Sequence, residues 1–134
     1  MGSSRYQDLI AWQRAITFVK RVYEITSELP QAETFGLKSQ MRRSAVSVAS
    51  NIAEGQGRAT AGECHQFLGR ARGSLYELET QIVIANELGY VSAEQCDSSL
   101  CEASELGRIL NGLMSSVKPS RRPVSRPPVL TTDN

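Results

Sequence analysis

The side chains best suited to metal or nucleophilic chemistry are scarce in this chain of 134 residues, which holds one histidine and three cysteines. His65 directly follows Cys64, and neighbouring residues of a helix lie on diverging faces, so these two cannot bind one metal ion. Cys96 and Cys101 are five positions apart, which places them about 140° apart around a helix. Neither pair has the spacing of a zinc site. The sequence therefore predicts no metal and no cofactor, and the cysteines are expected to be small core side chains.

The carboxylates form no acid–base pair of the kind that catalysis uses. Glu77 and Glu79 lie on different faces of one predicted helix, and the Glu-x-x-His motif of di-iron bundles does not occur. Gly55 and Gly57 precede Arg58 as in a phosphate loop, but no strand comes before them and no Lys-Ser/Thr pair follows. A lone histidine needs a carboxylate or a nucleophile beside it to act as a general base, and the sequence indicates none. We therefore expect the protein not to be an enzyme.

Lysine and arginine supply the chemistry that remains, and their distribution favours contact with phosphates. The formal charge of the whole chain is only +1, yet residues 1–72 carry +4, residues 73–117 carry −6 and residues 118–134 carry +3. Basic side chains bind phosphates without reading the base sequence. The candidates for nucleic-acid binding are Lys38, Arg42, Arg43, Arg58, Arg70 and Arg72.

The opposing interpretation of these cations is a solvated surface balanced by Glu24, Glu28 and Glu63. The linear pattern does not interleave aromatic residues with the cations, and aromatic rings are what stack on bases in single-stranded complexes. Composition alone therefore leaves both interpretations open.

Four segments with the apolar periodicity of amphipathic helices must position these residues. The first is expected from Asp8, as its N-cap, to Pro30. Its apolar side chains form two stripes at helical spacing, one of which runs from Leu9 to Thr26. The second stripe consists of Phe18, Val22, Ile25 and Leu29. Because two stripes are more than one bundle normally covers, the second is predicted to form a contact between copies of the chain.

The second segment is expected from Thr34 to Glu54, with Gly55 just past its end, and it is rich in serine and alanine. So many small residues indicate close approach by another helix, because serine has only middling helix propensity. One side of this segment is polar but short in its side chains, which suggests a subunit contact, an enclosed wet channel or a hydrogen-bond network within the monomer. Its candidates for a contact between copies are Ser47, Ser50, Asn51 and Glu54.

The third and fourth segments have the clearest boundaries. Thr60 with Glu63 and Ser92 with Gln95 form capping-box patterns, and Gly89 is expected to end the third helix. The apolar seam of the third segment is Cys64, Leu68, Ala71, Leu75, Leu78, Ile82 and Ala85. Long helices joined by short loops pack as antiparallel neighbours, so the predicted fold class is all-α, an up-down-up-down four-helix bundle over residues 1–117.

Residues 118–134 are basic and proline-rich, and they are predicted to be a disordered tail. The longest stretch without a charged residue spans only residues 44–53, far short of a membrane span. The N-terminus lacks the apolar run of a secretory signal, and an odd number of cysteines argues against a disulfide framework. These features predict a cytoplasmic protein without membrane contact.

Six runs of residues match a pattern known from one protein family: Tyr6–Leu9, Trp12–Ala15, Phe35–Ala45, Ser50–Arg58, Gly73–Gln81 and Leu88–Tyr90. The most specific are the Ser-Asn-Ile-Ala-Glu-Gly and Gly-Ser-Leu-x-Glu-Leu-Glu-Thr motifs within them. From Tyr6 to about Val117, the chain resembles the four helix bundle protein family, also called 23S rRNA intervening-sequence proteins.

This resemblance implies a bacterial, cytoplasmic four-helix bundle that assembles as a homopentameric ring. It also implies a relation to the accessory variability determinant of diversity-generating retroelements, a basic pentamer that binds nucleic acid and a reverse transcriptase. The net charge of +1 departs from those strongly basic proteins. We therefore expect a non-catalytic oligomeric module that contacts RNA, DNA or a ribonucleoprotein, as an accessory to a reverse transcriptase or another protein. The alternative is a protein–protein interaction scaffold.

Overall fold

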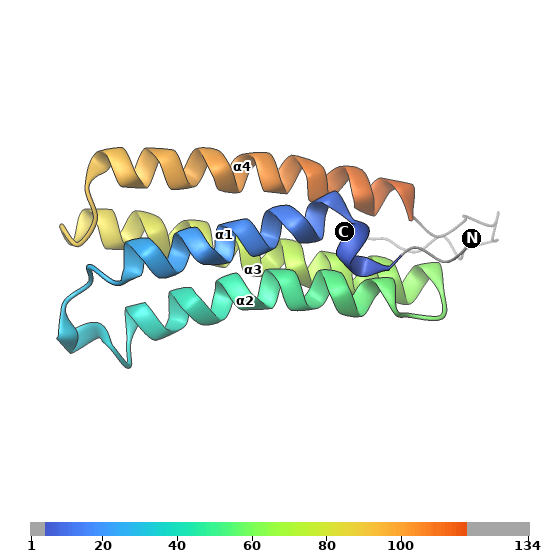
Figure 1. The fold of residues 1–134 in the computed structure, drawn as a ribbon, viewed down its shortest axis with the longest axis horizontal. Coiled ribbons are helices and arrows are strands. Elements are labelled where there is room, and N and C mark those ends of the chain that lie inside the picture. The colour runs from blue at the N-terminus through green and yellow to red at the C-terminus, as the bar shows by residue number, and fades with distance from the viewer. Residues whose placement is uncertain (1–4, 118–134) are drawn as a thin grey trace, which may run out of the picture.

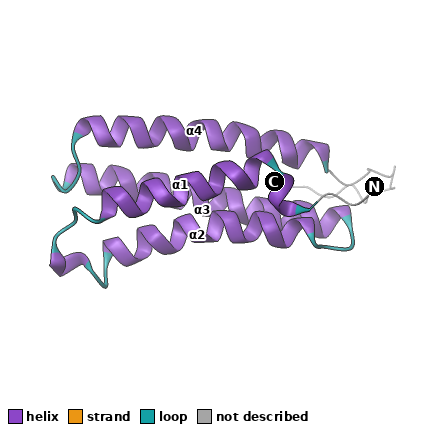
Figure 2. Cartoon of the chain, viewed as in Figure 1, coloured by secondary structure: helices purple, strands orange, loops and turns teal. Residues whose placement is uncertain are grey.

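Four α-helices run alongside one another along the long axis of the molecule (Figure 1). The computed structural model describes residues 5–117, and its helices are α1 Ile10–Thr26, α2 Leu37–Gln56, α3 Ala61–Glu87 and α4 Ala93–Ser116. Two short 3-10 turns precede α1 and α2, at Tyr6–Asp8 and Gln31–Glu33. Every regular element within residues 5–117 is a helix (Figure 2). The predicted all-α fold with four helices is confirmed.

Consecutive helices point in opposite directions (Figure 1) and pack as neighbours, α1 on α2, α2 on α3 and α3 on α4, and α1 also contacts α4. The start of α2 therefore lies at one end of the molecule, with the α3–α4 loop. The start of α3 lies at the other end, with the start of α1. The predicted homopentameric ring concerns several copies of the chain and stays a prediction.

The α1 stripe predicted to contact another copy lies in the core of the single chain. Its members are each 5% exposed or less: Phe18, Val22, Ile25 and Leu29. The prediction is wrong because a bundle helix meets two neighbouring helices and the bundle centre, which together cover both apolar stripes. The other stripe packs half-buried against the same core through Leu9, Trp12, Ile16 and Val19.

Two predicted helix boundaries are also wrong. Asp8 lies in the first 3-10 turn, and the N-cap of α1 is Leu9, which makes no side-chain cap. Gly55 lies inside α2 and is buried, while Gly57 follows the end of that helix. Asp8 has the right residue type for a cap, but the extended backbone that a cap requires falls one residue later.

Gly55 serves the packing of α2 on α3 rather than the end of a helix. A Cβ atom at this position would lie 3.2 Å from the Cys64 carbonyl oxygen and 3.3 Å from the Phe67 Cβ atom. The predicted seam of α3 is buried from Leu68 to Ala85, and only its first member, Cys64, is half-buried. The small residues of α2 therefore mark close approach by another helix, as predicted, and that helix is α3.

Local signals set the ends of α3 and α4 where they were expected. Thr60 Oγ1 accepts a hydrogen bond from the Glu63 backbone N–H at 3.1 Å, which is one of the two bonds of the predicted capping box. Ser92 and Gln95 cap each other reciprocally at the start of α4. Gly89 follows α3 with a φ of 78°, the left-handed conformation that commonly closes a helix. These ends hold the four helices in the register that the loops require.

Two further predictions concern membrane contact and the C-terminal tail. Among residues 5–117, no helix is long and apolar enough to cross a bilayer. The predicted basic, proline-rich tail at residues 118–134 lies outside the described residues.

Candidate nucleic-acid interface

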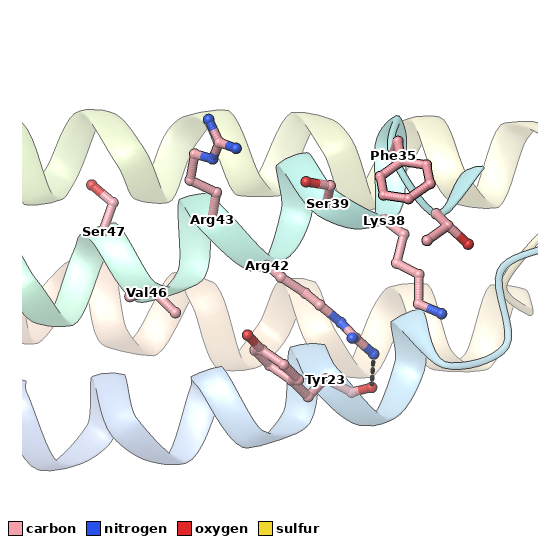
Figure 3. Close-up of a pocket in the computed structure, with 9 residues that line it drawn as sticks. Tyr23, Phe35, Lys38, Ser39, Arg42, Arg43, Val46 and Ser47 are labelled. Carbon is pink, nitrogen blue, oxygen red and sulfur yellow. Dashed lines mark hydrogen bonds between the residues drawn. The ribbon is translucent and has the colours of Figure 1, made fainter. Parts of the chain in front are cut away.

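A shallow groove runs along the solvent side of the first turns of α2 (Figure 3). Its volume is about 620 Å³, and it is lined by Tyr23, Thr34, Phe35, Lys38, Ser39, Arg42, Arg43, Val46 and Ser47. Three of the six predicted nucleic-acid residues are among them, and none of the lining residues is acidic. The groove therefore brings cations, hydroxyl groups and aromatic rings together.

Arg42 is held against the C-terminal end of α1. Its Nε donates a hydrogen bond to Thr26 Oγ1 at 2.8 Å, and its Nη2 donates to the Tyr23 carbonyl oxygen at 3.2 Å (Figure 3 shows the second bond). The guanidinium also lies over the Tyr23 ring, 4.2 Å from the ring centroid. Because a helix C-terminus attracts cations, these contacts cap α1 and fix the charge of Arg42 at the edge of the groove.

The other two cations extend from opposite sides of α2. Lys38 projects toward α1 together with Arg42, whereas Arg43 points toward α3 (Figure 3). Within residues 5–117, neither Lys38 nor Arg43 makes a hydrogen bond or an ion pair through its side chain, and Arg42 meets only uncharged oxygen atoms. Glu77 lines a second hollow beside Arg43 without forming an ion pair. The positive charge of the groove is thus not neutralised by a direct carboxylate contact.

The basic residues that join α1 to α4 behave differently. Arg14 Nη2 lies 2.7 Å from Glu105 Oε1, and Arg21 Nε lies 2.8 Å from Glu102 Oε1. Each of these arginines is paired with a carboxylate of α4. The interpretation of a solvated, self-balanced surface therefore fits the α1–α4 face and not the groove.

Phe35 projects from the turn before α2 and is 96% exposed. The turn is fixed by Glu33, whose carboxylate accepts hydrogen bonds from the Leu37 backbone N–H and from the Tyr90 hydroxyl, both at 3.0 Å. The bond to Glu33, with burial and the Glu33 charge as smaller causes, raises the pKa of Tyr90. A Cβ atom at Gly36 would lie 2.9 Å from Glu33 Oε1, so glycine leaves room for this cap. The exposed ring therefore sits on a turn that is tied to two other parts of the bundle.

A second basic cluster lies at the opposite end of the bundle, around Phe67 of α3. The guanidinium groups of Arg58 and Arg70 lie over its ring, 4.3 Å and 4.6 Å from the centroid. Arg58 also pairs with Glu54 at 3.3 Å. In this Phe67 cluster, the two guanidinium groups already cover the aromatic ring.

The six predicted cations therefore do not form one patch. Arg42 and Arg58 are sixteen positions apart on or just beyond α2, a rise of about 24 Å at 1.5 Å per residue. Arg72 points elsewhere, since its Nη1 donates to Asn111 Oδ1 of α4 at 3.0 Å. A single patch is ruled out because the antiparallel pairing of α2 and α3 carries these residues to different ends and sides.

The polar side of α2 is largely a hydrogen-bond network within the chain. The hydroxyl groups of Ser47 and Ser74 lie 2.8 Å apart across α2 and α3, and Asn51 Nδ2 donates to the Ser47 carbonyl oxygen at 2.9 Å. Of the residues predicted to contact another copy, Ser50 and Glu54 are exposed, whereas Ser47 and Asn51 are half-buried. The network within the monomer accounts for Ser47 and Asn51.

Two of the three cysteines, Cys64 and Cys96, have thiols that favour the protonated form. Burial raises the pKa of the Cys64 and Cys96 thiols, and thiols that stay protonated are weak nucleophiles and poor metal ligands. Cys96 is a core side chain as predicted, whereas Cys101 is exposed, so the prediction is wrong for Cys101. Among residues 5–117, no three His, Cys, Asp or Glu side chains gather in a way that could hold a metal ion.

The linear sequence conceals the aromatic part of the groove. Tyr23 reaches Arg42 only because α1 and α2 pair in antiparallel fashion, and the two residues are nineteen positions apart. The one local signal is Phe35, which comes three residues before Lys38 and directly before the glycine that opens α2. Aromatic rings are thus interleaved with the cations in space, although not along the chain.

Comparison with known proteins matches most of the chain to one family. A family model described as 23S rRNA-intervening sequence protein matches residues 7–112. A crystal structure from Bacteroides thetaiotaomicron, described as a protein with unknown function from the S23 ribosomal protein family, has a similar fold with a TM-score of 0.73 and 20% sequence identity. That similarity covers 78% of this chain and 98% of the other. No curated protein sequence matches. The chain therefore belongs to the family of 23S rRNA-intervening sequence proteins.

Proposed function

We propose that the protein is a non-catalytic, oligomeric binding module that contacts RNA or DNA, or a ribonucleoprotein, through the groove on α2. One observation carries the proposal: Lys38, Arg42 and Arg43 line a single groove, and none of them pairs with a carboxylate of residues 5–117. Cations in this state can approach phosphates without first breaking an internal ion pair. The release of counterions from the phosphates then favours binding.

The position of Arg42 strengthens this proposal. Its guanidinium is already held by Tyr23 and Thr26 before any ligand arrives. Immobilising a long side chain on binding costs about 0.5–1.5 kcal/mol of free energy. For Arg42, most of this cost arises during folding and not during binding. Lys38 and Arg43, which lack such contacts within residues 5–117, can adjust to the path of the backbone.

The comparisons support RNA as the polyanion. The family description refers to an intervening sequence of 23S rRNA, and the Bacteroides thetaiotaomicron structure is assigned to a ribosomal protein family, so both descriptions associate the family with the ribosome. The resemblance to accessory proteins of retroelements supports a related role, as an accessory to a reverse transcriptase in a bacterial cytoplasm. Both roles need a surface that binds phosphates of nucleic acid.

A homopentameric ring is the assembly we propose for this module. Since the apolar stripe of α1 is buried, a contact between copies must use other side chains. The second half of α3 and its C-cap residue expose apolar side chains, each 42–55% exposed: Tyr76, Val83, Ile84 and Leu88. A ring would repeat the groove on every subunit, and several linked sites bind one long polyanion more tightly than a single site does.

Fluorescence anisotropy of a labelled RNA oligonucleotide tests the binding function. The variant Lys38→Gln/Arg43→Gln is expected to bind about tenfold more weakly or worse, because charged hydrogen bonds are lost. The matched control is Arg14→Gln/Arg21→Gln, which removes the same charge from positions already paired with carboxylates of α4. The control should bind much like the original protein. Absence of binding to both RNA and DNA by the unaltered protein at low salt would overturn the proposal.

The alternative is a scaffold that docks another protein, and the exposed apolar side chains of α3 favour it. A scaffold would retain its protein partner after nuclease treatment. It would also be insensitive to Lys38→Gln/Arg43→Gln, since the groove would then serve only solubility. Retention that nuclease abolishes would exclude the scaffold and support contact through nucleic acid.

A further inference from the structure

The groove contains an aromatic ring that the bundle does not use for its own packing. Phe35 is 96% exposed, the most exposed of the large apolar side chains within residues 5–117. The backbone that carries the ring is held in place, because the turn is tied to α2 and to Tyr90 through Glu33. A solvent-facing ring on an anchored turn, beside cations without carboxylate partners, is an arrangement by which proteins stack nucleic-acid bases and hold the flanking phosphates.

On the basis of the proposed function, we propose that this groove takes an unpaired segment of RNA. One base stacks on the Phe35 ring, and the neighbouring phosphates contact Lys38, Arg42 and Arg43. The strand follows the solvent side of α2 from Phe35 toward Val46.

The spacing of the groove residues along α2 suits a single strand. Lys38 lies one turn before Arg42 and Arg43 (Figure 3), a rise of about 6 Å. The cations flank the groove on the α1 side and on the α3 side, so one strand can be contacted from both. Ser39 lines the same groove, and its hydroxyl can exchange a hydrogen bond with a ribose 2′-hydroxyl, the group that distinguishes RNA from DNA.

A duplex fits this groove poorly. Its bases are stacked on each other and paired, so none can lie on Phe35 unless it is unstacked first, at a cost of a few kcal/mol. An unpaired segment offers its base faces without that cost. The exposed ring is therefore the feature that separates a single strand from a duplex.

The N-terminus of α2 already has a carboxylate beside it. The N–H of Leu37 donates to the carboxylate of Glu33. A second anion at the helix end would be repelled by that carboxylate. Phosphate binding therefore falls to the side chains of the groove.

The Phe67 cluster has the same residue types but cannot act in the same way. Arg58 and Arg70 already lie over its ring, and Arg58 is paired with Glu54. A base would have to displace a guanidinium to reach Phe67. The single-strand site is thus assigned to one end of the bundle.

The decisive experiment measures binding of a labelled twelve-nucleotide RNA, free and annealed to its complement, by anisotropy with the full chain. The unaltered protein should bind the free strand more tightly than the duplex. Phe35→Leu should weaken binding of the free strand about 5- to 150-fold, the range expected when one stacked base is lost, and should leave duplex binding unchanged. Phe35→Tyr should keep the affinity of the original protein, because it keeps a ring.

Two controls separate stacking from other effects. Ile10→Ala removes another exposed apolar side chain, 60% exposed, from the opposite end of the bundle, and should not alter binding. Circular dichroism should show that Phe35→Leu folds normally, since almost none of the ring is buried.

The outcomes distinguish the inference from the proposed function. If Phe35→Leu binds the free strand as well as the original protein does, while Lys38→Gln/Arg43→Gln loses binding, the stacking inference is overturned and the binding function stands. Equal binding of the free strand and the duplex would likewise overturn the stacking inference and leave the binding function standing. If the unaltered protein binds neither RNA nor DNA, both proposals are overturned. Equal affinity for a single DNA strand of the same sequence would contradict the assignment to RNA.

Discussion

The two ends of the bundle carry the same kinds of residue in opposite states. At the start of α3, Phe67 lies beneath Arg58 and Arg70, and Arg58 is paired with Glu54. At the start of α2, Phe35 is bare and the groove cations meet no carboxylate of residues 5–117. At the start of α3 the ring is covered by cations, whereas at the start of α2 Arg42 lies over Tyr23 but Phe35, Lys38 and Arg43 make no such contacts within residues 5–117. Residue types alone therefore do not locate a binding surface, because the pairing within the fold decides which charges remain free to act.

The difference follows from how the helices pack at each end. The α2–α3 turn is short, and Gly55 allows α3 to approach α2 closely, which brings Phe67 within reach of Arg58, while Arg70 reaches the ring from three residues further along α3. The α1–α2 connection is longer, and its turn is tied to α2 and to Tyr90 through Glu33 while Phe35 faces the solvent. The short turn brings a cation onto the ring of Phe67, whereas the longer connection leaves the ring of Phe35 uncovered.

The largest expected effect is on stability, at the close contact between α2 and α3. Gly55→Val should destabilise the fold by about 2 kcal/mol, because the new side chain meets a backbone oxygen and a Cβ atom of α3 that cannot easily move. Urea denaturation followed by circular dichroism measures this change.

The control for that prediction is Gly73→Val. Nothing lies within 4 Å of a Cβ atom at Gly73, so the same substitution should change stability by less than about 0.5 kcal/mol. Equal destabilisation by the two substitutions would show that helix propensity, and not close packing, governs these glycines.

The next effect compares the two rings directly. Phe67→Ala should cost about 1–2 kcal/mol of stability, since it removes two cation–π contacts and a half-buried side chain. Phe35→Ala should change stability by less than about 0.5 kcal/mol, because its ring is almost wholly exposed. RNA affinity should show the reverse order. If both substitutions changed stability and affinity alike, the contrast between the two ends would not hold.

Local patterns were enough to predict the fold, and they failed where tertiary pairing decides. The caps at Thr60 and Ser92 and the seam of α3 are set by residues close together in sequence, so they could be predicted. The two stripes of α1 have the same period and similar apolarity, so the sequence could not rank them. Phe18 became core rather than contact surface because two neighbouring helices cover it.

The candidate site could be predicted only in part for a related reason. Lys38, Arg42 and Arg43 were visible as cations on one helix. Their lack of carboxylate partners depends on which helices lie beside them, as does the contact of Arg42 with Tyr23. No pattern within α2 indicates either property.

The smallest expected effect concerns the turn that presents Phe35. Tyr90→Phe removes one of the two hydrogen bonds to the Glu33 carboxylate, so stability should fall slightly at neutral pH. The pKa of Tyr90 is raised above its ordinary value of 10.0, which means that the folded chain favours the neutral hydroxyl. The contribution of Tyr90 is therefore complete below that value and is lost as the pH rises through the raised pKa.

Urea midpoints measured below and above pH 10.0 test this pH dependence. The original protein and Tyr90→Phe should differ below that value and converge once the pH exceeds the raised pKa of Tyr90. A difference that grows with alkaline pH would contradict the role assigned to the hydrogen bond between Tyr90 and Glu33.

The most direct test of the free charges in the groove is the salt dependence of RNA binding. Three neutralised phosphates predict that log K falls against log salt concentration with a slope of about −2 for a single strand, and Lys38→Gln/Arg43→Gln should reduce the slope to about −0.7. An RNA affinity whose salt slope is the same in the original protein and in this variant would show that the groove does not hold the phosphates.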